Sequence, residues 1–190
     1  AYLSGPARTD TEKARAIFRW MAERISYFPL SLRPQQPPPR QPEDVLRARR
    51  AVCDGYCRLF EALARAAGLE TATIEGYAKG YGYAAAGLAG RDYAAAGLAD
   101  RPDHCWSAVR ADGAWRLLDV TWGAGSLNDE GQFMRAFNPH YFFTPPAQLI
   151  YDHFPADPRW QLLDPPVSRE TFAGFVLVKP LFFRLGLRLD

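Results

Sequence analysis

The chain has 190 residues, of which 48% are hydrophobic and 14% aromatic, so it can bury one sizeable core but is short for two domains. A formal net charge of +2, with no basic run longer than Arg49-Arg50, argues against nucleic-acid binding. No apolar stretch approaches the roughly 18 residues of a membrane span, and no secretory leader is visible at the start. We expect a single domain over residues 1–190, and composition leaves the oligomeric state and the cell compartment open.

The cysteine count excludes a disulfide framework. Cys53, Cys57 and Cys105 are few and odd in number, and two cysteines four residues apart on one helix make a poor disulfide pair. No pair of C-x-x-C motifs occurs, so we expect no structural zinc site, and no other metal or cofactor.

The first predicted elements are an amphipathic helix, a proline-rich loop and a second helix. Residues 9–25 place apolar side chains at helical spacing, and Thr9 with Glu12 forms the sequence pattern of a capping box. Five prolines within residues 33–42 exclude a helix and favour an extended loop. A second helix is predicted from about Pro42 to Arg49.

A long helix and three strands are predicted in the middle of the chain. Residues 53–67 show strong helical spacing, and Gly68 is placed to end that helix. Residues 71–78 alternate as in a strand. Residues 104–111 and 114–121 flank an Asp-Gly pair, the best short signal of a β-hairpin. The pattern indicates an α+β fold, with helices packed on an antiparallel sheet.

A tandem repeat precedes the predicted hairpin: YAAAGLAGRD is followed by YAAAGLADRP over residues 83–102. One duplication is too short for a solenoid, so we interpret it as a duplicated surface loop. Because the repeat ends directly before His104, a lid beside a functional site is the alternative. Residues 138–166 are predicted to be loops with short elements, and Ser168 is a possible helix cap.

Cys53 is the candidate nucleophile because of its place at the expected start of the helix over residues 53–67. Unsatisfied N–H groups and the positive end of the helix dipole favour a thiolate there. Gly55 would let a substrate or another backbone segment approach closely. Cys57 lies one turn further in and Cys105 in a strand, so position favours Cys53 over both.

A thiolate nucleophile works with a general base and a group that orients the base. His104 opens the first strand of the predicted hairpin and Asp119 lies in the second, so the two arms would place them side by side. Aliphatic neighbours indicate that Asp119 is partly buried. His140 and His153 occur in aromatic, proline-rich loop sequence without a comparable partner, and we expect structural hydrogen bonding for both.

The sequences around these three residues resemble the core motifs of the transglutaminase-like superfamily. AVCDGYCRLFEALARAAGLE and HCWSAVRADGAWRLLDVTW are similar to its pattern of G-x-C-x-G-[YF] on a helix, H-A-W on a strand and D-x-T-W after it. Ala51 stands in place of the glycine, and Cys105 in place of the H-A-W alanine. GYAKGYGY, DVTWGAG and NPHYFFTPPAQLIYDHFPADPRWQLL resemble the kyphoscoliosis peptidase branch, so the resemblance extends from about Thr9 to Leu187. The duplicated loop is longer than the family's equivalent.

The resemblance implies a papain-like cysteine protease core with Cys53, His104 and Asp119 as its catalytic triad. The activity it implies is acyl transfer on protein or peptide amides through a Cys53 thioester, with hydrolysis favoured over crosslinking. Two other classes of function remain: a non-catalytic interaction or scaffold domain, which the complete triad argues against, and arylamine acetyltransfer, which the C-terminal half argues against.

The rest of the predicted site is less sharply defined. The Cys53 backbone N–H is a natural oxyanion donor at a helix start, and Gln41 is the candidate for a second donor. Trp106 and Trp122 flank the triad residues. Core packing is the preferred interpretation of both tryptophans, ahead of direct contact with a substrate.

Overall fold

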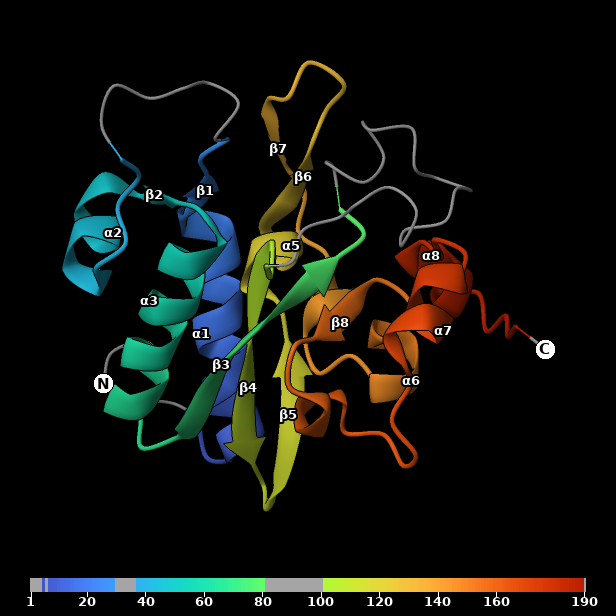
Figure 1. The fold of residues 1–190 in the computed structure, drawn as a ribbon. Helices are drawn as coiled ribbons and strands as arrows, with labels where there is room; N and C mark the ends of the chain where they lie inside the picture. The colour runs from blue at the N-terminus through green and yellow to red at the C-terminus, as the bar shows by residue number, and fades with distance from the viewer. Residues whose placement is uncertain (1–4, 6, 30–36, 81–100, 190) are drawn as a thin grey trace. The chain divides into compact units, whose positions relative to one another are not determined.

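The computed structural model describes residue 5 and residues 7–29, 37–80 and 101–189. The chain divides into two compact units, the first made of residues 1–74 and 105–144 and the second of residues 75–104 and 145–190. Helices are combined with a four-stranded antiparallel sheet of order β5-β4-β3-β8, so the predicted α+β class is confirmed (Figure 1). The duplicated segment lies almost entirely outside the described residues.

Helix α1, Asp10–Arg24, forms in the first unit where the sequence predicts it. The Thr9 side chain accepts a hydrogen bond from the Glu12 backbone N–H, and the Glu12 carboxylate accepts one from the Thr9 N–H. The predicted capping box is therefore present, and it satisfies N–H groups that the helix leaves free. The core-facing side chains are at most 1% exposed: Ala14, Ile17, Phe18, Met21 and Ala22.

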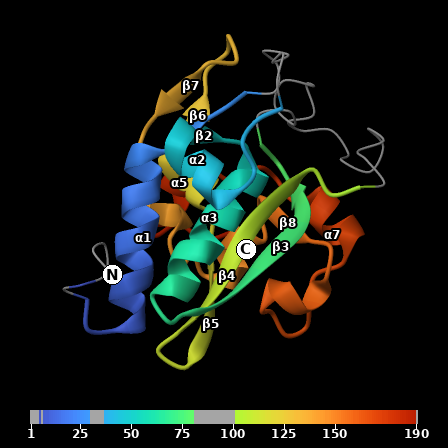
Figure 2. The ribbon, with the colours of Figure 1, turned by 90° about the vertical axis from the view of Figure 1, so that its left-hand side faces the viewer.

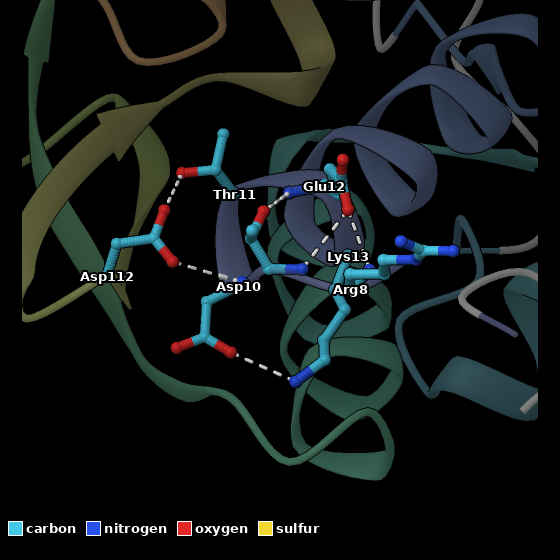
Figure 3. Close-up of polar contacts among 7 residues, drawn as sticks. Arg8, Asp10, Thr11, Glu12, Lys13 and Asp112 are labelled. Atoms are coloured by element: carbon cyan, nitrogen blue, oxygen red, sulfur yellow. Dashed lines mark hydrogen bonds and ion pairs between the residues drawn. The ribbon is translucent and has the colours of Figure 1, made fainter. Parts of the chain in front are cut away.

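The turn of the hairpin is held against the start of α1. Asp112 and Gly113 have φ angles of 49° and 85°, as a two-residue hairpin turn of type I′ requires. The Asp112 carboxylate accepts hydrogen bonds from the Asp10 backbone N–H at 3.2 Å and from the Thr11 hydroxyl at 2.6 Å (Figure 3). The Asp-Gly pair thus sets the turn and also fixes the hairpin to α1.

Two further helices complete the helical part of the first unit. Helix α2 spans Pro42–Ala48, and helix α3 spans Cys53–Ala66, as predicted. Short parallel strands β1, Ser26–Tyr27, and β2, Arg50–Ala51, pair immediately before α3. Helices α1 and α3 are in contact and lie side by side in both views (Figures 1 and 2). The strand pair therefore leads into the start of α3, and α1 packs against the helix.

Strands β4, His104–Ala111, and β5, Ala114–Leu118, form the predicted hairpin, with Ser107 opposite Leu118. Strand β5 ends at Leu118, earlier than the predicted boundary. The remaining elements of the first unit are β6, Gly125–Leu127, β7, Phe133–Arg135, and the short 3-10 helix η2, Pro139–Tyr141.

Asp119 does not lie in the second strand of the hairpin, and that prediction was wrong. It is the N-cap of helix α5, Val120–Ala124, and its carboxylate accepts a hydrogen bond from the Trp122 backbone N–H at 3.1 Å. Val120 and Thr121 favour strands by propensity, but a capped helical turn satisfies backbone donors that a continued strand would leave to solvent.

The second unit contains the end of strand β3, Glu70–Ala78, paired with β8, His153–Pro155, so that Tyr77 lies opposite Phe154. Strand β8 falls in sequence that predicted only loops and short elements. The Ser168 hydroxyl caps α7 by accepting from the Thr171 N–H at 3.1 Å, as predicted. The unit's other elements are α6, Pro146–Leu149, η3, Pro158–Gln161, α7, Arg169–Gly174, and α8, Pro180–Arg184.

The core of the second unit is formed by buried aromatic and aliphatic side chains from its strands and from α7: Tyr77, Ile150, Phe154, Phe172 and Ala173. Lys79 is also buried, with 2% of its surface exposed. Its ammonium group donates to the carbonyl of Phe172 at 2.8 Å and to that of Phe175 at 2.5 Å. This lysine therefore satisfies carbonyl groups at the end of α7.

None of the helices in the described part of the chain is both long enough and apolar enough to cross a membrane.

Candidate functional site

Cys53 is the first residue of α3, and its side chain is half-buried. The N-cap residue Val52 makes no side-chain hydrogen bond to the helix, so no side chain competes as a cap at this helix start. The next residue, Asp54, is acidic, but its carboxylate accepts from Arg40 at 2.6 Å and from Arg58 at 3.0 Å. Burial raises the pKa of Asp54, and these two guanidinium groups outweigh that effect and lower it. The paired charge opposes a Cys53 thiolate less than a free carboxylate would.

The first turn of α3 admits another backbone segment at Gly55. A Cβ atom built on Gly55 would lie 2.7 Å from the Pro39 carbonyl oxygen and 2.7 Å from the Ala51 Cβ. The expectation that Gly55 permits a close backbone approach is confirmed, and the approaching segment is the one that leads into α2. Glycine here fixes the path of the chain beside the candidate nucleophile.

Asp119 is 1% exposed and is held through both its backbone and its side chain. Its N–H donates to the Tyr141 carbonyl at 2.9 Å, in addition to the carboxylate cap on α5. Helix α5 contacts both α1 and α3 within the first unit. The predicted burial of this carboxylate is confirmed, although its local structure differs from the prediction.

Tyr27 is a residue near this site that the sequence did not single out. Burial raises the pKa of the Tyr27 hydroxyl to about 12, and the negative charges of Cys53 and Asp119 add to the effect. The hydroxyl is therefore protonated at neutral pH. Tyr27 lies in the two-residue strand β1, which is too short for a period-2 signal to mark it.

The other two thiols lie inside the first unit. Cys57 is 3% exposed and Cys105 is 7% exposed. The thiols of Cys53, Cys57 and Cys105 influence one another's pKa. Cys53 lowers the pKa of Cys105, but Cys57 and burial raise it well above the usual range. The pKa of Cys57 is raised as well: Cys105 lowers it, and burial outweighs that effect.

His104 is the first residue of β4, is half-buried, and belongs to the second unit. The residue before it holds the chain against β3: the Asp103 N–H donates to Gly76 and its carboxylate accepts from the Ala78 N–H, each at 3.0 Å. Burial raises the pKa of Asp103, against the effect of these hydrogen bonds. Asp103 thus positions the backbone from which the imidazole projects.

A second histidine lies beside His104. His153 is 1% exposed, its ring centroid is 5.5 Å from that of His104, and its Nδ1 is 2.6 Å from the Asp152 carboxylate. The expectation that His153 lies in a loop without a comparable partner was wrong, whereas the hydrogen bonding expected of it is present. Its partner is the preceding residue, which lies in the turn before β8, and the strand that begins at His153 was not recognised among the prolines around it.

The other predicted site residues have simpler surroundings. Gln41 is the exposed N-cap residue of α2 and makes no side-chain cap. Trp106 is 1% exposed, as core packing requires, whereas the half-buried Trp122 meets the Tyr141 ring edge-on at 5.3 Å. The His140 ring packs on Tyr141 at 5.0 Å. A role for Gln41 as an oxyanion donor stays a prediction, as does the lack of a metal or cofactor.

The first unit contains two of the three predicted catalytic residues, Cys53 and Asp119, and the second contains His104. The hydrogen bonds that a triad requires, from His104 to Asp119 and to Cys53, stay a prediction.

Comparison with known proteins agrees with the motifs. The model of the transglutaminase-like superfamily matches residues 1–120. The chain is 37% identical to the human kyphoscoliosis peptidase over 95% of its length, 34% identical to Hillarin of Drosophila melanogaster over 97%, and 32% identical to the Lim and transglutaminase domain protein ltd-1 of Caenorhabditis elegans over 97%. It spans about a quarter of each relative, namely 26%, 23% and 26% of their lengths.

Proposed function

The chain belongs to the transglutaminase-like superfamily, and we propose that it is a cysteine-dependent acyl-transfer enzyme with Cys53 as its nucleophile. The observation that carries the proposal is the half-buried thiol at the first residue of α3, next to an acidic residue whose charge is paired. Cys57 and Cys105 are buried, and their pKa values are raised. Cys53 is thus the thiol best placed to meet a substrate.

We assign His104 as the general base and Asp119 as the group that orients it. The motifs support this assignment, because His104 and Asp119 stand where the superfamily pattern has its histidine and its aspartate. Asp119 caps α5, and α5 contacts α3, the helix that begins at Cys53, which supports a shared site for the thiol and the carboxylate. His153, with Asp152 as its partner, is the second candidate for the base.

In the proposed reaction, the Cys53 thiolate attacks the carbonyl carbon of a protein or peptide amide. The Cys53 backbone N–H stabilises the oxyanion, and His104 gives a proton to the leaving amine, which produces a thioester. Water then attacks the thioester in hydrolysis, or an amine attacks it in transamidation. We favour hydrolysis because the human relative of the chain is named a peptidase.

The decisive experiment is trapping with a thiol-directed electrophile. Iodoacetamide at pH 7 is expected to label Cys53 first, because a helix start with a histidine partner lowers a thiol pKa from about 8.5 by several units. His104→Ala should slow this labelling, and Asp119→Asn should slow it less, because the carboxylate only orients the imidazole. His140→Ala is the matched control and should have no effect.

The outcomes separate the competing functions. Equal labelling of Cys57 or Cys105 in the folded protein would refute the nucleophile assignment and favour a non-catalytic scaffold domain. A slower reaction in His153→Ala than in His104→Ala would move the base to His153. After trapping with an activated acyl ester, release of the free acid indicates hydrolysis, whereas incorporation of an added primary amine indicates transamidation.

A further inference from the structure

Two histidines of the second unit lie side by side, and the proposed acyl transfer uses only one of them as its base. The ring centroids of His104 and His153 are 5.5 Å apart, and their ring planes meet at 58°. A centroid separation of about 4.5–7 Å is typical of aromatic rings in contact. The His153 ring therefore forms one wall of the space that the His104 imidazole occupies.

His153 is buried and hydrogen-bonded, whereas His104 is half-buried. The His153 side chain is 0% exposed, and its Nδ1 lies 2.6 Å from the carboxylate of Asp152, a side chain that is itself 5% exposed. Because a carboxylate only accepts hydrogen bonds, Nδ1 carries the hydrogen, and the bond fixes both the tautomer and the plane of the ring. A buried ring with a fixed plane is a rigid surface against which a neighbouring side chain can rest.

The backbones that carry the two histidines are joined through β3, which lies between β4 and β8 in the sheet (Figure 1). Ala78 of β3 pairs with His153, and its N–H donates at 3.0 Å to the carboxylate of Asp103, the residue before His104. The Asp103 N–H donates to the Gly76 carbonyl, also at 3.0 Å. The separation of the two rings is therefore set by paired strands, which position side chains more precisely than loops do.

We propose that His153 is a positioning residue: its ring, fixed by Asp152, holds the His104 imidazole in the rotamer from which it acts on Cys53. The inference rests on the proposed role of His104 as the general base. A base transfers a proton only when its nitrogen lies within about 3 Å of the reacting group, so an imidazole that turns among several rotamers spends part of its time in unproductive ones. Packing on a fixed neighbour reduces this loss. His153 itself exchanges no proton in this role.

The test measures the rate at which iodoacetamide labels Cys53 in the whole chain. His153→Asn removes the ring, while its amide nitrogen donates to Asp152 in place of Nδ1, so the buried carboxylate keeps a donor. This variant should be labelled about tenfold more slowly than the wild type, because a small misplacement of a catalytic group costs much of its effect. In a His104→Ala background the same change should have no further effect, because His153 acts through His104. His140→Ala is the matched control and should be labelled normally.

A second measurement reports the orientation of His104 directly. The three-bond NMR couplings about its χ1 should indicate one rotamer in the wild type and an average over rotamers in His153→Asn. Asp152→Asn keeps an acceptor oxygen for the Nδ1–H of His153 and should retain most of the labelling rate, whereas Asp152→Ala frees the ring and should lose about as much as His153→Asn. Circular dichroism checks the fold of each variant, and the two Asp152 variants carry the test should His153→Asn unfold.

Three results would overturn the proposal. The first is labelling of His153→Asn at the wild-type rate while His104→Ala is labelled slowly. The second is an equal slowing by His153→Asn with and without the His104 imidazole. The third is slower labelling of His153→Asn than of His104→Ala, since His153 would then be the base. Failure of the proposed function looks different: His104→Ala would be labelled at Cys53 as fast as the wild type, and the NMR couplings would still show whether His153 holds His104.

Discussion

Replacing Gly55 with alanine tests the close packing beside Cys53. The added Cβ would lie 2.7 Å from the Pro39 carbonyl oxygen and from the Ala51 Cβ, and 3.1 Å from the Val45 Cγ2. Ordinary contact begins near 3.4 Å, so the first two neighbours must each yield by about 0.7 Å. One of them is a backbone oxygen, which cannot turn away by changing rotamer. The segment that leads into α2 must move, and with it the packing around the first turn of α3.

The sign of the effect depends on two opposing contributions. Alanine in place of glycine inside a helix stabilises by about 1 kcal/mol, because the unfolded chain loses less entropy. Overpacking a tight interior costs about 1–3 kcal/mol. With two contacts this short we expect the overpacking to win, and Gly55→Ala to lower the unfolding free energy by about 1–2 kcal/mol.

Gly174 in α7 provides the matched control. A Cβ built there meets no atom within 4 Å, so Gly174→Ala should be neutral or stabilise by up to about 1 kcal/mol. Urea unfolding followed by circular dichroism measures both variants, and iodoacetamide labelling shows whether Cys53 has become more accessible. If Gly55→Ala were as stable as the wild type, the segment around Pro39 would have to yield freely, and the argument for a fixed path beside Cys53 would fail.

Three further predictions concern polar groups. Burial lowers the pKa of Lys79 to about 8, with Asp152 opposing the effect, so the unfolded chain holds this proton up to about pH 10.5 while the folded chain releases it. The unfolding free energy should therefore rise between pH 8 and 10, by at most about 3 kcal/mol, and Lys79→Met should remove that rise in urea titrations. Tyr56→Phe removes a hydrogen bond of 2.7 Å to the Ile25 carbonyl, to which Arg135 still donates at 3.1 Å, so the unfolding free energy should fall by only about 1 kcal/mol. If the double variant with Arg135→Leu lost only the sum of the two single losses, the shared role of the two donors would be contradicted. The Thr11 hydroxyl lowers the pKa of Asp112, so Asp112→Asn should reduce the melting temperature at neutral pH. The difference in melting temperature between wild type and variant should shrink as the pH falls below the pKa of an ordinary carboxyl group. A difference that stays constant with pH would disprove the contribution of the charge.

Elements with strong local signals were predicted well. The capping box at Thr9 and Glu12, the glycine that ends α3 and the Asp-Gly turn each act within a few residues, so the sequence alone carries their physical cause. The buried carboxylate at Asp119 was also predicted, from its aliphatic neighbours. The secondary structure around Asp119 was predicted wrongly. The same sequence could place this carboxylate at the end of a strand or at the cap of a helix, and only the hydrogen bond from the Trp122 N–H distinguishes the two.

The groups missed by the sequence depend on pairing between distant segments. Strand β8 has only three residues and is bounded by proline, so its strand character comes from its partner β3. His153 and Asp152 looked like loop residues for that reason, although they are buried. Tyr27 likewise lies in a two-residue strand that exists only through pairing with β2. Local pattern cannot reveal such residues, since their burial is decided by contacts far along the chain.

The same distinction applies to the cysteines. The sequence placed Cys53 at a helix start, and the structure shows that Cys53 is more exposed than Cys57 and Cys105. This difference could be predicted because a helix terminus is a local feature. Whether Cys105 lies near Cys53 cannot be inferred from local pattern, since β4 begins about fifty residues after the start of α3. A departure from the superfamily pattern was nevertheless visible at Cys105, where alanine is usual. Because the residue at this position is a thiol, Cys105→Ala separates its reactivity from that of Cys53 in the labelling experiment.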